Sequence, residues 1–291
     1  MKGYKAFNKG LICKGKQYKE NETFEEERAV PCHRGMHFCK NPFDVLNFYD
    51  LVDENGEFSD FARVEAPDDA EVKTYDNIKY CTTKLKVGAK FSFAGFVKTC
   101  VDFVIEKTQT EKPDSGYSAK IGSSGYSAQI GSSGDSAQIG SSGDYAQIGS
   151  SGDSAQIGSS GNYAQIGSSG NSAKIGSSGD SAQIGSSGDY AQIGSSGYSA
   201  QIGSSGNYAQ IGSSGNSAKI KSTGYDSIIC CAGDDSCVSA KKGSWITLAE
   251  WKYSYEKDRY VPKCVKTEYV DGERIKEDTM YKLIDGEFTE V

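Results

Sequence analysis

Hydrophobic positions recur with a period of nine residues through the middle of the chain. Ile occupies every ninth position, and Ala precedes each Ile by two residues. The twelve isoleucines are Ile121, Ile130, Ile139, Ile148, Ile157, Ile166, Ile175, Ile184, Ile193, Ile202, Ile211 and Ile220. Because residues i and i+2 share one face of a strand, each unit predicts a short β-strand. We expect Ala137 and Ile139 to face inward, Ser136 and Gln138 to face outward, and Gly140 to Gly143 to form the corner.

One nine-residue unit is too short to close a coil, since two strands, two corners and a sheet separation of ~10 Å need more chain. One coil must therefore contain two or three units. The position three before each Ile is Ser except at Tyr145, Tyr163, Tyr190 and Tyr208. An eighteen-residue coil stacks all four tyrosines in two pairs, whereas a coil of twenty-seven stacks only Tyr163 on Tyr190. Because aromatic neighbours across strands favour each other, we prefer eighteen.

The outward positions of such a solenoid are polar. We expect the glutamines to form ladders between coils, as at Gln129 and Gln147. The lysine variants Lys120, Lys174 and Lys219 never lie one coil apart, which avoids stacking like charges. A partner-binding face is predicted from the outward residues Tyr145, Tyr163, Tyr190, Tyr208, Gln138, Gln147, Gln156 and Gln165.

The repeat continues in degenerate form to Leu248. Ile228 and Cys237 take the outward position held elsewhere by Gln. The outer face therefore turns apolar at this end, where we expect a C-terminal segment to cover it. Fifteen units give about seven coils, or ~35 Å of solenoid at ~4.8 Å per coil.

Both ends of such a stack need caps, because an unpaired strand edge templates aggregation. Apolar residues between 92 and 108 have helical spacing, with Ser92 as N-cap, and a helix here would cover the first coil. After the stack, Asp271-Gly272 and Asp285-Gly286 each predict a two-residue hairpin turn. An antiparallel meander is therefore expected to close the chain.

The first 90 residues predict a separate α+β domain. Strands are expected near Tyr4 to Phe7 and Phe61 to Glu65, a helix from Pro42 to Tyr49 with Asn41 as N-cap, and a turn at Asn55-Gly56.

The predicted fold class is therefore mainly β. A parallel β-solenoid with two nine-residue units per coil is capped by an N-terminal α+β domain and a C-terminal antiparallel meander. The domains are 1–112, which includes the capping helix 92–108, then the solenoid 113–248 and the β cap 249–291.

Charge and composition narrow the function. The 291 residues carry 32 Lys and Arg against 39 Asp and Glu, a net charge of −7, which excludes generic nucleic-acid binding. No apolar run approaches the ~20 residues that span a bilayer, so we expect no membrane association. Nine cysteines, an odd number without a framework of regular spacing, are typical of free thiols in a cytoplasmic protein.

Candidate chemistry is sparse. The only two histidines lie in Cys32-His33-Arg34-Gly35-Met36-His37-Phe38-Cys39. Cys32, His33, His37 and Cys39, with Cys13 as a fifth residue, could supply a tetrahedral zinc set. The alternative is buried thiols beside a packed histidine. No nucleophile elbow or phosphate-binding Gly-x-x-x-x-Gly-Lys motif occurs, so we expect no catalytic residue and no cofactor.

The two ends of the chain carry a resemblance. Tyr4 to Asn8, Gly35 to Cys39 and Asn41-Pro42, with the closing Asp271 to Glu273 and Tyr281 to Leu283, resemble a family of uncharacterised bacterial and prophage proteins that bear variable numbers of such repeats. That resemblance implies no known activity. Gly35 to Tyr49 is also similar to the strand-helix step of ADP-ribosyltransferases.

Four functions remain as hypotheses. The leading one is a non-enzymatic interaction or scaffold protein whose flat polar faces bind an unknown protein, with side-by-side self-association of solenoids as a further expectation. The others are an ADP-ribosyltransferase-like or ligand-binding N-terminal domain displayed on the solenoid, a phage-related inhibitor of a host or defence enzyme, and ice binding.

Overall fold

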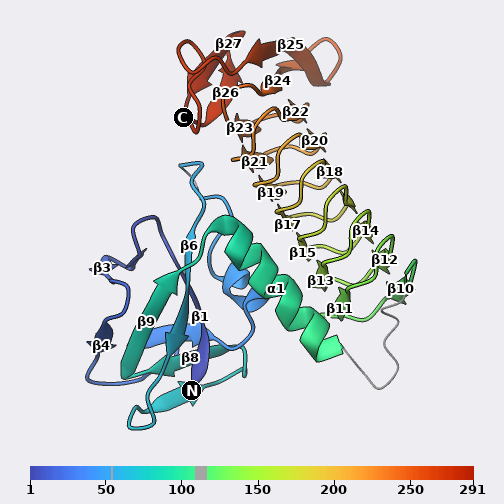
Figure 1. Cartoon of the computed structure of the whole chain (residues 1–291). Coiled ribbons are helices and arrows are strands. Elements are labelled where there is room, and N and C mark those ends of the chain that lie inside the picture. The colour runs from blue at the N-terminus through green and yellow to red at the C-terminus, as the bar shows by residue number, and fades with distance from the viewer. Residues whose placement is uncertain (54, 109–116) are drawn as a thin grey trace.

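The computed structural model describes residues 1–53, 55–108 and 117–291. The chain is mainly β, with a sheet near the N-terminus, a parallel β-solenoid and two C-terminal hairpins (Figure 1). The one α-helix in the described part of the chain is too short to cross a bilayer.

The solenoid has two sheets, and alternate repeat units contribute to each. The even sheet contains β10 (Lys120–Ser123), β12 (Gln138–Ser141), β14 (Gln156–Ser159), β16 (Lys174–Ser177), β18 (Gln192–Ser195), β20 (Gln210–Ser213) and β22 (Ile228–Cys231). The odd sheet contains β11 (Gln129–Ser132), β13 (Gln147–Ser150), β15 (Gln165–Ser168), β17 (Gln183–Ser186), β19 (Gln201–Ser204), β21 (Lys219–Ser222) and β23 (Cys237–Ser239). Ile139 pairs with Ile157, one coil of eighteen residues later, which confirms the two-unit coil.

The tyrosine stacking that favoured this coil is present. The ring centroids of Tyr145 and Tyr163 lie 4.9 Å apart, and those of Tyr190 and Tyr208 lie 5.0 Å apart. Lys174 pairs with Gln156 and Gln192 rather than with another lysine. Both observations agree with the sequence analysis.

The expected position of the corner was wrong. Gly140 and Ser141 belong to the strand, and the corner follows at residues 142–145. Ser136 does not face outward from a strand, because it lies in the corner with a φ of +57°. The glycine that the corner requires is Gly143, where a Cβ would lie only 2.0 Å from the carbonyl oxygen of Gly125 in the preceding coil.

Polar contacts join successive corners. The carboxylate of Asp144 accepts the backbone N–H of Asn162 at 2.7 Å, and Asp153 accepts that of Asn171 in the same way. Inside the coil, Ala and Ile are buried together with a column of serines. Ser150 and Ser168 are fully buried, and their hydroxyls have no hydrogen-bond partner among the described residues.

The N-terminal region forms an antiparallel sheet in the order β4-β9-β6-β1-β5-β8-β7. Its strands are β1 (Lys2–Phe7), β4 (Thr23–Glu25), β5 (Met36–Cys39), β6 (Asp60–Glu65), β7 (Val72–Thr74), β8 (Lys79–Thr82) and β9 (Lys84–Lys90), and a small hairpin joins β2 (Ile12–Cys13) to β3 (Lys16–Gln17). The expected strands near Tyr4 and Phe61 are therefore present as β1 and β6, which pair with each other.

The helix expected from Pro42 to Tyr49 is instead a 3₁₀ helix, η1 (Phe43–Asn47). Asn41 does act at its start, since the Asn41 side chain accepts the N–H of Phe43 at 3.0 Å. The segment is only five residues long, a length typical of 3₁₀ helices, and it buries Phe43, Val45 and Leu46.

The helix expected at 92–108 is α1 (Phe93–Thr108), and Ser92 caps it by accepting the N–H of Gly95 at 3.1 Å. The helix covers β11 of the first coil, as expected, but it does not stop there. The helix runs along the outward surface of the odd sheet, over β11, β13, β15 and β17 (Figure 1). Its apolar side packs there because the strands present glycine rather than a side chain at the contact.

The C-terminal residues form two hairpins. In the first, β24 (Trp245–Ser254) pairs with β22 and then with β25 (Arg259–Tyr269), which ends the even sheet. In the second, β26 (Tyr281–Ile284) pairs with β23 and β27 (Glu287–Glu290), which ends the odd sheet.

The turn at Asp285-Gly286 is therefore confirmed. The turn at Asp271-Gly272 joins no strand pair, because Asp271 instead accepts the N–H groups of Glu273 and Ile275 within a loop.

Candidate interaction surface

The two outward surfaces of the solenoid differ although the repeats that form them are nearly identical. We call the outward surface of the even sheet the even face and that of the odd sheet the odd face. The N-terminal region covers the odd face, and the described residues leave the even face open (Figure 1). A candidate binding surface has to be sought on the even face.

On the odd face, glutamines bind the N-terminal region. Gln147 accepts a hydrogen bond from the amide of Asn41 at 2.7 Å and donates one to Asp44 at 2.8 Å. Gln165 donates to the side-chain oxygen of Asn47 at 2.9 Å. Burial raises the pKa of Asp44 above its usual range, although the hydrogen bond from Gln147 opposes that effect.

Gln147 and Gln165 were expected on a partner-binding face, and the structure corrects that expectation. Their exposed fractions are 7% and 3%, because the N-terminal region occupies the surface into which they project. The predicted ladder exists among these residues, since Gln129 donates to Gln147 at 3.1 Å and Gln147 donates to Gln165 at 3.2 Å.

The glycine column of the odd face forms the contact surface for α1. A Cβ built on Gly131 would lie 2.7 Å from the Cα of Ile105, and one on Gly149 would lie 3.1 Å from the Cα of Val101. Glycine is therefore required here for the helix to approach the strands.

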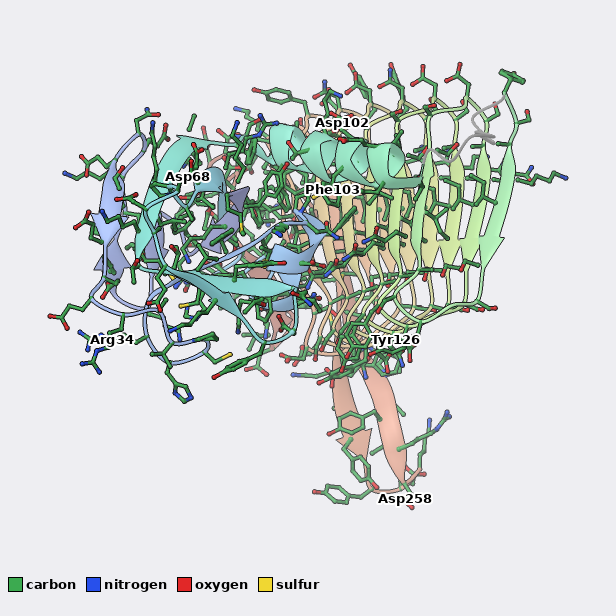
Figure 2. All side chains as sticks on the ribbon, turned by 90° about the horizontal axis from the view of Figure 1, so that it is seen from below. Arg34, Asp68, Asp102, Phe103, Tyr126 and Asp258 are labelled. Carbon is green, nitrogen blue, oxygen red and sulfur yellow. The ribbon has the colours of Figure 1, made fainter. Side chains whose placement is uncertain are left out.

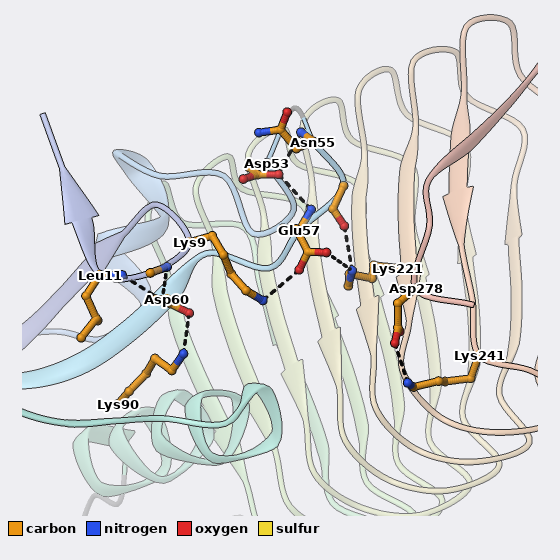
Figure 3. Close-up of polar contacts among 12 residues, drawn as sticks. Lys9, Leu11, Asp53, Asn55, Glu57, Asp60, Lys90, Lys221, Lys241 and Asp278 are labelled. Carbon is orange, nitrogen blue, oxygen red and sulfur yellow. Dashed lines mark hydrogen bonds and ion pairs between the residues drawn. The ribbon is translucent and has the colours of Figure 1, made fainter. Parts of the chain in front are cut away.

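A lysine replaces glycine one coil beyond the helix. Lys221 is only 3% exposed, and its ammonium donates to the Gly56 carbonyl at 3.0 Å and to Glu57 at 3.3 Å (Figure 3). Lys9 also donates to Glu57, at 2.9 Å. Burial raises the pKa of Glu57, but Lys9 and Lys221 outweigh burial and hold the net pKa below its usual value.

The even face has the same repeat without the covering. Cβ atoms on Gly140 or Gly158 would meet no other atom within 4 Å. The glycine column is the floor of a shallow groove of about 1140 Å³, whose lining runs from Lys120 to Ile228. Gln138 and Gln156, both expected at a binding face, are exposed beside this groove.

An apolar row ends the even face. Ile228 pairs with Trp245, and Trp245 pairs with Tyr269, so the three side chains lie in register on adjacent strands. Their exposed fractions are 58%, 49% and 40%. We call these three residues the apolar row. Beyond them the β24–β25 hairpin projects from the body, with Asp258 near its tip (Figure 2).

The expectation that a C-terminal segment covers this end is met on one sheet only. Cys237 is buried against Val52 and Met280 on the odd face. Ile228 stays exposed, because the hairpin extends the even sheet sideways instead of folding over it.

The four tyrosines expected on one face lie on two edges. Tyr145 and Tyr163 occupy corners that enter odd strands, and Tyr190 and Tyr208 occupy corners that enter even strands. All four have a positive φ, between +56° and +58°, so they project from corners rather than from a flat sheet. Tyr145 and Tyr163 also line a cavity of about 540 Å³ that η1 closes from the other side.

The cysteine and histidine cluster does not assemble a zinc set in the described part of the chain, where no three His, Cys, Asp or Glu side chains are placed to hold a metal. Cys32 is exposed and Cys39 is buried, and His37 is held by accepting the N–H of Cys32 at 3.0 Å. Cys13, Cys32, His33 and His37 line one cavity of the N-terminal region without forming such a set.

The comparisons with known proteins add one result. Residues 1–99 match the profile of a family described as a domain of unknown function (DUF7666). No curated protein and no solved structure matches the chain. The N-terminal sheet region is thus similar to that family over a third of the chain, and the solenoid follows it.

Proposed function

We propose that the chain is a non-enzymatic interaction protein that presents the even face to a protein partner. The apolar row carries this proposal. Trp and Tyr are enriched where protein interfaces concentrate their binding energy, and soluble proteins seldom leave such side chains adjacent and exposed without a use. The glutamines that line the groove provide hydrogen-bonding groups for the polar rim of such an interface.

The odd face provides a precedent for binding of a folded protein by this repeat surface. There the repeat surface binds a folded partner, the chain's own N-terminal region, through glutamine hydrogen bonds and a close helix contact. The even face offers the same columns of Gln and Gly. Gln138, Gln156, Tyr190 and Tyr208 are proposed as contact residues, because they adjoin the even strands. In a prophage setting, inhibition of a host or defence enzyme is one form that this function takes.

Affinity capture from the native cell, read by mass spectrometry, tests the proposal. The variant Ile228→Gln restores the residue of the other units and so preserves the repeat, while it removes one end of the apolar row, next to Trp245. We expect it to weaken capture by tenfold or more. Tyr255→Ser is the matched control, since Tyr255 is 92% exposed on the adjoining β24–β25 hairpin but outside the apolar row. Equal capture by both variants contradicts the proposal.

A second candidate function is a small-molecule site in the N-terminal region. A cavity of about 420 Å³ beside β1, β5 and η1 favours it, because this volume is typical of ligand pockets. Its wall includes part of the segment Gly35 to Tyr49 that is similar to ADP-ribosyltransferases. Calorimetry of the full chain with nicotinamide dinucleotide tests the ADP-ribosyltransferase-like form, and the absence of heat at millimolar ligand argues against it.

Ice binding has less support, since known ice binders resemble regular threonine ladders. The outward columns of the even strands are Gln or Lys and Gly. A thermal hysteresis measurement separates this function from protein binding, because only an ice binder lowers the freezing point without lowering the melting point.

A further inference from the structure

The cavity of the N-terminal region has an uneven distribution of charge. Five basic side chains line it, Lys5, Lys14, Lys16, Arg34 and Lys79, against the single carboxylate of Glu26. Such an imbalance in a partly enclosed space produces a positive potential that attracts anions.

Ion pairs neutralise only two of these cations. Lys16 pairs with Glu26 at 2.6 Å, and Arg34 pairs with Glu27 at 3.0 Å. Among the described residues, Lys5, Lys14 and Lys79 form no ion pair. Three amino groups therefore face the cavity without a counter-charge from the described residues, although burial lowers the pKa of Lys5.

Lys5 is the most unusual of the three because it is only 5% exposed. Its ammonium donates to the His37 carbonyl at 2.9 Å and to the Cys13 sulfur at 3.5 Å. An ammonium has three N–H donors, so one has no acceptor in the described part of the chain. Burying a charge without a counter-ion is costly, and a bound anion would reduce that cost.

The pKa of His37 is affected by the same positive charges. Burial, and then the charges of Lys5, Lys79 and Lys14, lower the pKa of His37 to about 4. The imidazole is therefore neutral near pH 7 and adds no charge of its own.

Aromatic rings supply the other wall. Tyr18 and Tyr49 line the cavity, and the Tyr49 hydroxyl donates to the Cys13 sulfur at 2.9 Å. Phe48 lies under the ammonium of Lys79, which is 4.2 Å from the ring centroid. The cavity thus places cations beside flat apolar surfaces, a combination suited to an organic anion rather than to a bare ion.

We propose that this cavity binds a small organic anion, with its phosphate or carboxylate group among Lys5, Lys14 and Lys79 and its body against Tyr18 and Phe48. The assignment rests on the second candidate function and names its ligand class. The proposal does not depend on whether the even face binds a protein partner.

Alkylation of Cys13 in the full chain tests the charge preference. Iodoacetate and iodoacetamide differ mainly in that the first is an anion. Each reagent forms a carbon–sulfur bond to the thiolate and releases iodide. Cys230, which is exposed on the solenoid, serves as the internal reference. We expect the iodoacetate-to-iodoacetamide rate ratio, read by peptide mass spectrometry, to be about five- to tenfold higher at Cys13 than at Cys230.

Two further measurements complete the test. Pyrophosphate, added as an unreactive anion, should slow alkylation of Cys13 and leave Cys230 unchanged. Lys79→Gln and Lys14→Gln should each lower the rate ratio at Cys13, whereas Lys14→Arg should keep it. Lys19→Gln is the matched control, because Lys19 is an exposed lysine that does not line the cavity.

The contrary outcomes are distinguishable. If Cys13 reacts readily but with the rate ratio of Cys230, the cavity admits small molecules without preferring anions, and only the ligand class is wrong. If Cys13 resists both reagents and pyrophosphate gives no heat in calorimetry, the cavity is closed to ligands. That result overturns the ligand class and the second candidate function together.

Discussion

Asn41 and Gln147 lie 106 positions apart in the chain, yet the amide of Asn41 donates to the side-chain oxygen of Gln147 at 2.7 Å in a buried contact. The same Gln147 also binds Asp44 and Gln165. One repeat residue thus joins the N-terminal region to the ladder of the odd face.

Removing that junction should destabilise the fold. Gln147→Ala leaves the buried Asn41 and the half-buried Asp44 side chains without their partner, at a cost of about 1–3 kcal/mol in the free energy of unfolding. Gln138→Ala removes the same side chain from the exposed even face and should cost less than about 0.5 kcal/mol. Urea denaturation of both variants measures the difference. Equal costs would show that the odd-face contacts contribute nothing to stability.

The ion cluster around Glu57 predicts a loss of stability in acid. Because the folded-state pKa of Glu57 is lowered, its contribution is complete above the ordinary value of 4.5 and is lost as the pH falls through the folded value. Lys221→Met removes one of its two cations, so it should lower the melting temperature more at pH 7 than at pH 3. Lys19→Met is the control. It removes an exposed ion pair in which the Lys19 ammonium lies 3.9 Å from the Glu22 carboxylate, and it should have no such pH-dependent effect. A pH-independent loss for Lys221→Met would refute the role of the Glu57 charge.

The interior serines predict a stabilising substitution. The hydroxyl of Ser168 is buried and has no hydrogen-bond partner among the described residues. Its desolvation therefore destabilises the folded state, and no hydrogen bond offsets that effect. Ser168→Ala should therefore raise the free energy of unfolding by up to about 1 kcal/mol. Ser222→Ala is the control and should destabilise, because the Ser222 hydroxyl is hydrogen-bonded to that of Ser227 at 3.1 Å. Thermal unfolding of the two variants should show shifts of opposite sign.

The two hairpins predict the outcome of truncation. A chain ending at Val238 loses the antiparallel strands that terminate both sheets, and it exposes the edges of β22 and β23. We expect it to form large assemblies on size-exclusion chromatography.

Deleting one whole coil, residues 143–160, is the control for that truncation. It keeps both hairpins and should stay monomeric. It should melt at a lower temperature, because Lys221 then moves by ~4.8 Å relative to Glu57. A monomeric 1–238 chain would contradict the capping role.

Much of the solenoid could be predicted because its signal is repeated. The spacing of Ile139 and Ile148 gives the unit, and the positions of Tyr145 and Tyr163 give the coil. The phase of the corner could not be predicted, since each unit offers two glycines. Gly140 and Gly143 look equivalent in sequence, and only the close approach of Gly143 to the preceding coil distinguishes them.

The asymmetry of the two faces was harder still to predict. Gln138 and Gln147 occupy sequence contexts that differ only in Ser136 and Tyr145, and other units of both faces carry either residue, so no local pattern distinguishes the open face from the covered one. The one available signal was Lys221, which interrupts the glycine column one coil beyond the start of α1. The cavity around Lys5 also escaped prediction, because strands distant in sequence bring Lys5, Cys13 and Lys79 together.

The position of α1 along the odd face has a consequence for how the stack opens. Repeat proteins usually fray unit by unit, since each unit touches only its neighbours. From Ile105 over Gly131 to Phe93 over Gly203, one rigid helix clamps coils that would otherwise separate independently. Amide hydrogen exchange should then slow together across the clamped coils, with faster exchange in the first even strand, β10. The stack would behave as one cooperative body with a single loose end.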